Sequence, residues 1–483
     1  MSRTLDAQRL AALAGDFPRQ PAYLGLRQAL QELIGDGRIP LGTRLPSERA
    51  VAAALGLSRI TVARAYSELV EAGYASARQG AGTFAAVPVD RRRAHDHALR
   101  PLDPGRPEAG GFDFNCAASA ATPGTAAAYE RALAALPAYL AGDGYLPSGL
   151  PELRARIAAH YVQRGLATDA SQIVVTAGAL SGISILARAL SRPGDRVLVE
   201  TPVYPNAIEA LRAGGGRLVA SPLADPLGED GWDYEGIEAT LRQTAPCLAY
   251  LIPDFQNPTG FLMPAAGRER LAAALAATRT RPIIDETLQP TDLAGSAMPP
   301  PFAAFCPDAV TVGSLSKIFW GGLRVGWIRA PRELVGRILQ ARVHVDLGGS
   351  LFDQLVALQL LGDEAVLAGR RAALREQRDA LVAALRDRLP DWRFRVPRGG
   401  LSLWVRLPGG SATQLAARLE PENVFLAPGP VFNVEGGGDQ WLRLPFARSA
   451  AELAGGVARI ADALGRATRS PAGSAPAPQV LIA

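Results

Sequence analysis

The stretch SLSKIFWGGLRVGW, residues 314–327, contains the one lysine of the chain, Lys317. The sequence holds 51 lysine and arginine residues, so every other basic side chain belongs to arginine. An arginine guanidinium stays protonated in proteins, whereas a lysine amine that is desolvated or close to other cations can lose its proton and bond to an aldehyde. The retained lysine therefore favours covalent chemistry at this position over a surface lysine that survived by chance.

Short apolar runs around this stretch predict the sheet that carries it. They alternate with alanine- and leucine-rich segments of helix length, a pattern typical of an α/β domain with a mainly parallel sheet and helices on both faces. We expect a small α+β part at its C-terminal end. The predicted strands are QIVVTAG (172–178), RVLVETP (196–202), CLAYLIP (247–253), RPIIDE (281–286), AVTVGS (309–314) and RVGWIRA (324–330).

Polar side chains follow these strands at the edge where α/β folds bind ligands. Asp285 ends one run and could pair with a protonated pyridine nitrogen, or cap a helix. Asn257, in PDFQNPTG, could donate to a ring phenolate, although asparagine before proline is also a common turn residue. Two hydroxyls and a guanidinium surround Lys317 and suit a phosphate dianion; these belong to Ser314, Ser316 and Arg324.

Three further features complete the candidate ligand site. In TAGALSGI, residues 176–183, the backbone of Ala179 and Leu180 opens a helix whose N–H groups favour the same phosphate. Tyr204 could stack on an aromatic ring or belong to the core. Arg443 lies in the apolar run WLRLPFA and needs an anion, either a ligand carboxylate or a nearby Asp or Glu. Pyridoxal 5′-phosphate (PLP), with its aldehyde on Lys317, satisfies the whole set.

The positive charge of the chain lies in its first fifth. The formal net charge is +5, and residues 1–100 hold 14 arginines against 9 acidic residues, so the rest of the chain is neutral. This asymmetry indicates an anionic partner for the N-terminal part, with nucleic acid the leading candidate.

The residues between 21 and 84 predict short helices followed by a hairpin. Leu26, Leu30, Leu33 and Ile34 recur at helical spacing in a helix that ends near Gly35 or Gly37. Ser47 is a natural N-cap for a second helix, which ends at Gly56, and Ser58 caps a third. The exposed face of the third helix suits insertion into a DNA major groove, while the hairpin could reach phosphates; the alternative is an ordinary solvated bundle. These residues are Arg59, Thr61 and Arg64 on the helix and Arg78 in the hairpin.

The sequence GTRLPSERAVAAALGLSRITVARAYSEL, followed by GAGTF, closely resembles that of the GntR-type winged helix-turn-helix. That resemblance implies double-stranded DNA as a partner. It also implies that Arg49 and Arg59 contact DNA backbone or bases, with Ser58 and Thr61 beside them and Gly80 in the wing.

The large domain resembles fold-type I aminotransferases, through YLPSGLPELR, TPVY, QNPTG, IIDE, SLSK…GLRVGW and WLRLPFA in that order. A GntR-type domain ahead of such a domain is the arrangement of the MocR-like regulators. The resemblance implies PLP on Lys317, its pyridine nitrogen on Asp285, its 3-hydroxyl on Asn257 and the carboxylate of an amino-acid or amine effector on Arg443. It further implies a head-to-tail homodimer in which Tyr145 reaches the neighbouring subunit's phosphate site.

Some positions depart from the family pattern. Many relatives have a tyrosine two or three residues after the aspartate, where this chain has Thr287 and Leu288. The usual Pro-Gly before the LR pair is Gly321-Gly322, and the glycine-serine-glutamine phosphate loop is Ala179-Leu180-Ser181.

We expect five regions: an N-terminal tail (1–18), a winged helix-turn-helix (19–87), a linker (88–112), an aminotransferase-like domain (113–465) and a disordered tail (466–483). The arginines at 91–93, in the linker, could add phosphate contacts. No apolar run is long enough to span a membrane. Cys116, Cys247 and Cys306 are too far apart in sequence for a CxxC motif, and with four histidines they suggest neither a zinc site nor a disulfide framework. A cytoplasmic location fits best.

Three functions remain open on these residues. The first is a transcriptional regulator that senses an amino-acid-like effector, or PLP itself, through its aminotransferase-like domain. The second is a working aminotransferase with an appended DNA-binding domain. The third is a DNA-binding protein that has lost its cofactor, against which Lys317, Asp285 and Arg324 argue.

Overall fold

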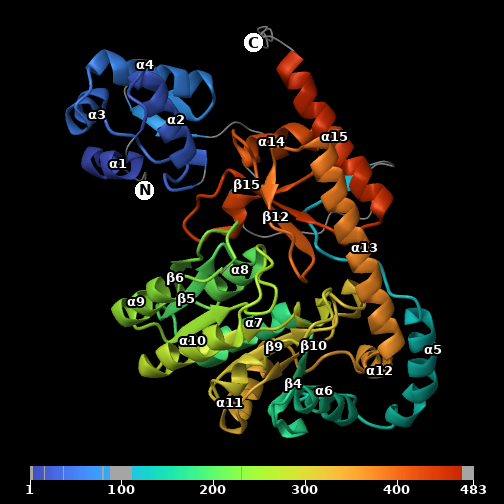
Figure 1. The fold of residues 1–483 in the computed structure, drawn as a ribbon. Coiled ribbons are helices and arrows are strands. Elements are labelled where there is room, and N and C mark those ends of the chain that lie inside the picture. The colour runs from blue at the N-terminus through green and yellow to red at the C-terminus, as the bar shows by residue number, and fades with distance from the viewer. Residues whose placement is uncertain are drawn as a thin grey trace, which may run out of the picture.

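The fold is that of a computed structural model, which describes residues 4–15, 17–35, 37–78, 81–86, 111–229 and 231–469. Figure 1 shows a small N-terminal domain, a large sheet with helices on both faces, and a smaller C-terminal part between them. The predicted linker falls almost entirely on residues 87–110, and these lie outside the described residues, as do residues 470–483 of the predicted tail.

The N-terminal domain packs four helices against a two-stranded antiparallel hairpin. Its core is built by apolar residues at helical spacing, including Leu26, Leu30 and Val62, which are fully buried. Ser47 and Ser58 cap their helices as predicted, and Gly56 ends the first of these in the left-handed conformation. The elements are α1 (Ala7–Ala14), α2 (Ala22–Gly35), α3 (Glu48–Leu55), α4 (Arg59–Glu71), β1 (Ala75–Arg78) and β2 (Gly82–Ala85).

The predicted N-terminal tail contains a helix, which is a correction to the sequence prediction. Helix α1 buries Leu10 completely, and Phe17 also belongs to the core of this domain. The DNA-binding domain therefore includes residues before position 19.

The large subdomain contains a seven-stranded sheet in order β4-β10-β9-β8-β7-β5-β6 within the described residues. All pairings are parallel except those of β10, which runs antiparallel to β4 and β9. The six predicted strands are confirmed, and β6 was missed. The strands are β4 (Ile173–Thr176), β5 (Arg196–Thr201), β6 (Arg217–Pro222), β7 (Leu248–Leu251), β8 (Arg281–Asp285), β9 (Val310–Ser314) and β10 (Gly326–Arg329).

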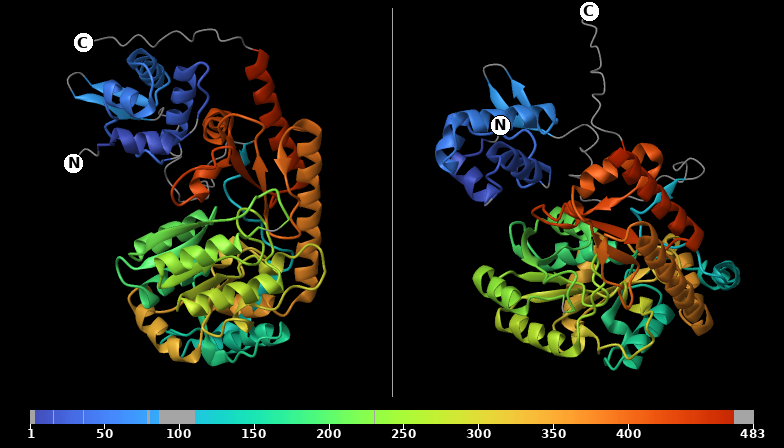
Figure 2. Two further views of the ribbon diagram at one scale, coloured as in Figure 1. Left: turned by 60° about the vertical axis from the view of Figure 1, so that its left-hand side comes forward. Right: turned by 45° about the horizontal axis from the view of Figure 1, so that its top comes forward.

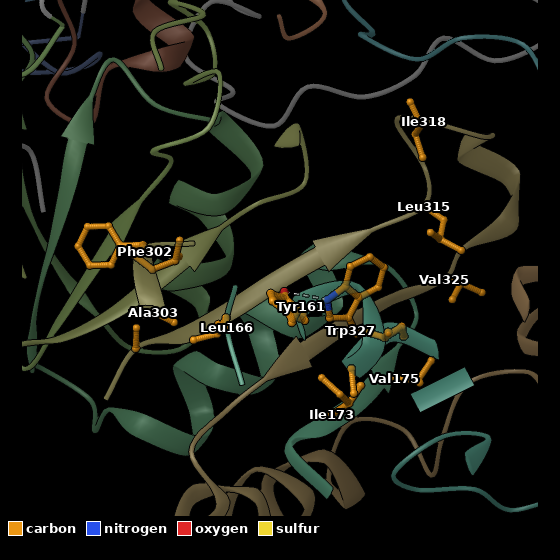
Figure 3. Packing of buried hydrophobic residues seen from close by; sticks show 14 of the residues in the cluster. Tyr161, Leu166, Ile173, Val175, Phe302, Ala303, Leu315, Ile318, Val325 and Trp327 are labelled. Carbon is orange, nitrogen blue, oxygen red and sulfur yellow. Dashed lines mark hydrogen bonds between the residues drawn. The ribbon is translucent and has the colours of Figure 1, made fainter. Parts of the chain in front are cut away.

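Helices cover both faces of this sheet (Figures 1 and 2). One face packs against α7 (Ala179–Leu190), α8 (Pro205–Ala213) and α11 (Arg332–Val343). The other packs against α6 (Pro151–Gln163), α9 (Tyr234–Thr244), α10 (Ala265–Ala277) and α12 (Leu351–Leu360), with α5 (Thr125–Ala135) against α12. Figure 3 shows part of this second core, where Trp327 Nε1 donates to the Tyr161 hydroxyl at 3.1 Å. The continuous burial of the central strands explains why their sequences do not alternate.

The small subdomain is α+β, as expected. Its sheet has the order β11-β12-β15-β14, and β3 pairs with β13 beside it. The long helix α13 runs from the large subdomain to the small one, where it packs against α15 (Figure 1). The elements are β3 (Phe112–Asp113), α13 (Glu364–Arg388), β11 (Arg393–Phe394), β12 (Ser402–Arg406), α14 (Ala412–Leu419), β13 (Val424–Phe425), β14 (Ala427–Pro428), β15 (Trp441–Pro445) and α15 (Ala450–Arg469).

Two boundaries differ slightly from the prediction. Phe112, assigned to the linker, starts β3, and α15 continues to Arg469, four residues into the predicted tail. Short 3-10 segments complete the described fold: η2 (Leu136–Tyr139), η3 (Ala170–Gln172), η4 (Gln289–Thr291), η5 (Phe302–Ala304), η6 (Gly321–Leu323), η7 (Glu420–Glu422) and η8 (Gly429–Phe432).

Candidate functional site

The carboxyl edge of the large sheet gathers the residues singled out in the sequence. Asp285 ends β8, Asn257 follows β7, Tyr204 follows β5 and Lys317 follows β9. Arg443 comes from β15 of the small subdomain. The charges of Arg443 and Asp285 both influence the pKa of Lys317. The predicted cluster therefore forms where the two subdomains meet.

Lys317 is partly buried, and its Nζ donates to the carbonyl oxygen of Ala117 at 2.9 Å. Burial lowers the pKa of this amine, and the positive charges of Arg443 and Arg324 lower it further, while Cys116 and Asp285 act in the opposite direction. A lysine with a lowered pKa has a larger neutral fraction, which is the form that attacks an aldehyde.

Asp285 is 5% exposed and is held from two sides. Its Oδ1 accepts from the backbone N–H of Thr287 at 2.8 Å, and its Oδ2 accepts from the Tyr250 hydroxyl at 2.6 Å. Burial raises the pKa of this carboxyl, and contact with a cation would favour its ionised form. Sequence reasoning did not identify Tyr250. This residue lies inside β7, and its hydroxyl reaches Asp285 at the end of the neighbouring strand β8.

An anion cradle lies between the end of β9 and the start of α7. The Ser314 hydroxyl donates to that of Ser316 at 3.0 Å, and Arg324 Nη2 donates to the carbonyl of Ala177 at 2.9 Å. Helix α7 begins after Gly178 without a side-chain cap, so its first N–H groups, from Ala179 and Leu180 onward, can bind an anion.

Two glycines allow close packing beside this cradle. A Cβ on Gly178 would lie 2.8 Å from Arg324 Nη2, and a Cβ on Gly326 would lie 2.6 Å from the Gly178 carbonyl carbon. Gly178 also has a φ of +90°, which disfavours other residues. The backbone of β10 can therefore pass directly beside the start of α7.

Asn257 and Tyr204 lie half-buried on the loops that follow β7 and β5. Asn257 Oδ1 is buried and has no hydrogen-bond partner in the part of the chain that the structure describes. Burial raises the pKa of Tyr204 to about 12, so its hydroxyl is neutral. Both loops are tied together because Gln256 Nε2 donates to the Pro202 carbonyl at 2.7 Å.

Arg443 is a buried cation, only 2% exposed. Its Nη2 donates to the carbonyl of Asn115, and its Nε has no hydrogen-bond partner among the described residues. None of the ion pairs within that part of the chain includes Arg443. Burial lowers its pKa to about 10, despite the opposing effects of Cys116, Tyr204 and Asp113. The sequence allowed an Asp or Glu as the structural partner of Arg443, and no such ion pair is found among the described residues.

Besides Tyr250, the residues that the sequence missed at this site are Asn115, Cys116 and Ala117. They follow β3 in an irregular segment without apolar periodicity, and their carbonyl contacts with Arg443 and Lys317 join positions far apart in sequence. Tyr145, by contrast, is 61% exposed. Its predicted contact with a neighbouring subunit remains a prediction.

The predicted DNA-binding side chains lie on the exposed side of α3, α4 and the hairpin. Arg49 is exposed, and the side chain of Arg59 is 74% exposed while pairing with Glu48 at 3.3 Å. Ser58 Oγ accepts from the backbone N–H of Thr61 at 3.0 Å. Ile60, which the sequence prediction overlooked, is 81% exposed beside them.

Two other arginines of this domain already have partners. Arg64 pairs with Glu68 at 3.2 Å, donates to the Tyr23 hydroxyl at 2.8 Å and lies over the Tyr23 ring. Arg78 lies over the ring of Phe84, 4.7 Å from its centroid. Gly80 and the arginines at 91–93 lie outside the described residues.

Two family models match the chain. Residues 140–460 match aminotransferase class I and II, and residues 22–85 match the gntR family of bacterial regulatory proteins. The chain therefore belongs to the aminotransferase class I and II family, whose enzymes depend on PLP, and carries a GntR-type DNA-binding domain before it. This fusion is the arrangement of the MocR-like regulators.

Named relatives share the whole arrangement. The HTH-type transcriptional regulator TauR of Rhodobacter capsulatus is 32% identical over 91% of this chain and 96% of its own length. The pyridoxine biosynthesis regulator PdxR of Corynebacterium glutamicum is 30% identical over 80% and 83%. These full-length matches favour a regulator over an enzyme.

Relatives that match the large domain include enzymes. The 2-aminoadipate transaminase of Thermus thermophilus is 32% identical over 68% of this chain and 81% of its own. Among solved structures, the α-aminoadipate aminotransferase LysN of that organism, complexed with N-(5′-phosphopyridoxyl)-L-leucine, is 30% identical and superimposes with a TM-score of 0.67. The match covers 74% of this chain and 93% of LysN.

Within the residues that the structure describes, no helix is long and apolar enough to cross a membrane.

Proposed function

We propose that this protein is a transcriptional regulator that binds PLP and an amino-acid-like effector in its aminotransferase-like domain and thereby changes its affinity for DNA. The observation that carries the proposal is that one chain joins a GntR-type domain to a site where the single lysine lies close enough to a buried arginine for its charge to act on it, and this arginine has no ion-pair partner among the described residues.

The donor set fits PLP. Asp285 is a buried carboxylate suited to a protonated pyridine nitrogen. The half-buried Asn257 has a side-chain NH2 group that could donate to the ring oxygen, and its Oδ1 has no partner among the described residues. The cradle of Ser314, Ser316 and Arg324 at the start of α7 supplies donors for a phosphate. When bound, PLP would supply an aldehyde to which amines attach reversibly and a ring that withdraws electrons from them.

An effector with both an amine and a carboxylate fits the remaining groups. Lys317 would hold the aldehyde of the cofactor, which is also the group that an effector amine can bind, and Arg443 would bind the effector carboxylate. The leucine adduct bound to LysN has this chemistry, which supports an amino acid as the effector class. Tyr204 would close one side of the aromatic ring.

The test is a DNA-binding titration of the full-length protein with the DNA that lies upstream of its own gene. We expect the affinity or the footprint to change when PLP and members of an amino-acid panel are added, and not with PLP and simple amines that lack a carboxylate. DNA binding that is identical under all conditions would contradict the sensing function.

The second candidate is a working aminotransferase, because Lys317, Asp285 and Arg443 could serve catalysis as well as binding. Single-turnover conversion of the bound cofactor, followed by its absorbance with each amino acid, separates the two. Rapid turnover with a 2-oxo acid, together with unchanged DNA binding, would favour the enzyme.

A further inference from the structure

Arg329 is a buried cation at the edge of the large sheet opposite to Lys317. It ends β10, and because β10 runs antiparallel to β4 and β9, it lies beside the starts of those two strands. Arg329 is 5% exposed and lines a hollow of about 540 Å³ that opens to solvent. The walls of the hollow are the loop after α6, the segment before β9 and the start of α11. Leu166 and Ala303 lie on two of these walls (Figure 3).

The charge of Arg329 has no ion-pair partner among the described residues. Its Nε donates to Thr168 Oγ1 at 3.0 Å, while its Nη1 is buried and has no hydrogen-bond partner in that part of the chain. The acid whose charge acts on it, Glu286, is already paired with Arg164 at 2.7 Å. Burial lowers the pKa of Arg329, although a guanidinium still stays protonated at neutral pH.

The buried ion pairs that adjoin Glu286 balance without Arg329. Arg268 pairs with Asp254 at 2.6 Å, and Arg164 pairs with Glu286, so two cations face two carboxylates. Tyr161, whose ring centroid lies 5.9 Å from the Arg329 Cζ, adds no charge, because burial raises the pKa of its hydroxyl. Arg329 therefore leaves one positive charge in excess. Because an unmatched buried charge is costly, an anion from outside the chain would be stabilised next to it.

Helix α11 supplies further groups for an anion at the same hollow. It has 12 residues, begins there after Pro331 and has no side-chain cap, so its first backbone N–H groups lack helical partners. These N–H groups and the helix dipole favour negative charge. Arg332, the other arginine that lines the hollow, is already paired with Asp169. The free donors for an anion are therefore those of Arg329 and of the start of α11.

The remaining lining limits the kind of anion. Asp308 and Glu333 are exposed acidic residues of the hollow, and they disfavour a ligand with a second negative charge, such as a phosphate dianion. Leu166, Ala303 and Pro307 offer apolar surface for a hydrocarbon group. A small organic monocarboxylate meets both conditions, and its two oxygens match the guanidinium fork.

We propose that the hollow beside Arg329 is a second ligand site, which binds a small organic monocarboxylate. The carboxylate lies on the Arg329 guanidinium and the first N–H groups of α11, and the hydrocarbon part lies on Leu166 and Ala303. The proposal goes beyond the proposed function and does not depend on it, because none of these residues is assigned to PLP, its effector or DNA.

The test is benzoate binding to the full-length protein without PLP, measured by isothermal titration calorimetry. Benzamide has a similar shape without the charge, and inorganic phosphate has charge without the hydrocarbon. Arg443→Gln is the parent protein beside the wild type, so that benzoate on Arg443 is not mistaken for benzoate on Arg329. We expect one benzoate per parent chain and much weaker binding of the other two compounds. Benzamide or phosphate that binds as tightly as benzoate would overturn the monocarboxylate assignment.

Two further variants of the parent locate the bound benzoate. Arg329→Met should weaken benzoate binding by about tenfold or more, because it removes both the charge and the fork of donors. Arg337→Gln is the matched control and should bind benzoate like the parent, since Arg337 is an exposed arginine of α11 that does not line the hollow. Equal benzoate affinity in Arg329→Met and the parent would exclude the site.

Thermal stability separates an unmatched cation from a structural one. Without ligand, Arg329→Met should melt at or above the parent temperature, because the variant removes an uncompensated buried charge and keeps an extended side chain in its place. Benzoate should raise the melting temperature of the parent but not that of Arg329→Met. A clear drop in the melting temperature of ligand-free Arg329→Met would show that the charge is already matched within the fold, and would overturn the proposal.

Discussion

Lys317 makes the cofactor hypothesis testable with one substitution. We expect wild-type protein incubated with PLP to absorb in the visible range and to retain the cofactor covalently after borohydride reduction. Lys317→Ala should lose both properties, because no other lysine occurs in the sequence. Ser316→Ala is the control: it should weaken PLP binding through the phosphate but keep the covalent attachment. A reduced cofactor adduct on a side chain of the Lys317→Ala protein would refute the assignment.

Arg443 provides the second test at the residue scale. Because its fully buried guanidinium has no carboxylate partner among the described residues, its removal leaves no unpaired acid behind. We therefore expect Arg443→Gln to melt near the wild-type temperature, in contrast to the loss of about 3–5 kcal/mol that follows when a buried ion pair is broken. PLP should still bind, but amino acids should no longer change DNA affinity.

A large drop in melting temperature, measured by calorimetry without ligand, would instead identify Arg443 as structural. An unchanged response to amino acids in the DNA titration would also contradict its role in carboxylate binding.

The sequence could predict the residues at strand ends but not the surroundings that they share. Asp285 and Lys317 follow short apolar runs, so their common edge follows from parallel pairing alone. Tyr250 could not be recognised as a partner of Asp285, because that contact depends on β7 lying next to β8. Nor could Asn115 and Ala117, whose carbonyls meet Arg443 and Lys317 only in the folded chain.

At the scale of elements, burial decided which strands and helices were visible in the sequence. The central strands are continuously buried and were all predicted. Strand β6 lies at the edge of the sheet with a mixture of exposed, half-buried and buried residues, so RLVASP carries a weak signal. Helix α1 was missed for a similar reason, since Leu10 is its one buried residue.

Helix α4 carries the prediction for DNA binding. Arg59 stands at its first turn with a largely exposed side chain and one surface ion pair, to Glu48, which DNA phosphates or bases can replace at little cost. Arg59→Ala should weaken specific binding by roughly tenfold to a hundredfold, as for a base contact of about 1–3 kcal/mol. PLP absorbance should not change.

Arg78→Ala in the hairpin is the comparison for Arg59. A phosphate contact there should weaken all DNA sequences alike and lower the dependence of binding on salt concentration. Fluorescence anisotropy with operator and random DNA at several salt concentrations distinguishes the two arginines. Equal operator affinity in Arg59→Ala and wild type would mean that another surface, such as that around Ile60, reads the bases.

At the scale of the whole molecule, the DNA-binding domain and the proposed ligand site are separate in charge and in space. The entire net positive charge lies in the first 100 residues, whereas the remainder is neutral. Figure 2 shows the DNA-binding domain on the side of the small subdomain, where Gln414 of α14 donates to the Tyr74 hydroxyl at 3.0 Å. The sequence divides the chain into these parts but contains no local signal for that contact. On the proposed function, a signal between the two sites would pass through the small subdomain, the connecting residues or a second subunit.

The last prediction concerns the homodimer that the family resemblance implies. Tyr145 is 61% exposed and Leu140 nearby is 69% exposed, although both are large and partly apolar, which suits burial against another copy of the chain. If Tyr145 completes the partner's phosphate site, a Tyr145→Ala homodimer binds PLP weakly and a Lys317→Ala homodimer cannot hold it covalently. Mixing the two variants after dissociation creates heterodimers with one intact site, which combines Lys317 of one subunit with Tyr145 of the other. Random pairing should restore tight, borohydride-reducible PLP binding to about a quarter of all sites, measured by titration at low PLP concentration.

Tyr145→Phe, which keeps the ring but removes the hydroxyl, should bind PLP more weakly than wild type if the hydroxyl contacts the phosphate. If the mixture binds no more PLP than the average of its two components, Tyr145 acts within its own subunit or not at all, because only an exchange of residues across the dimer can produce a complete site from two defective chains.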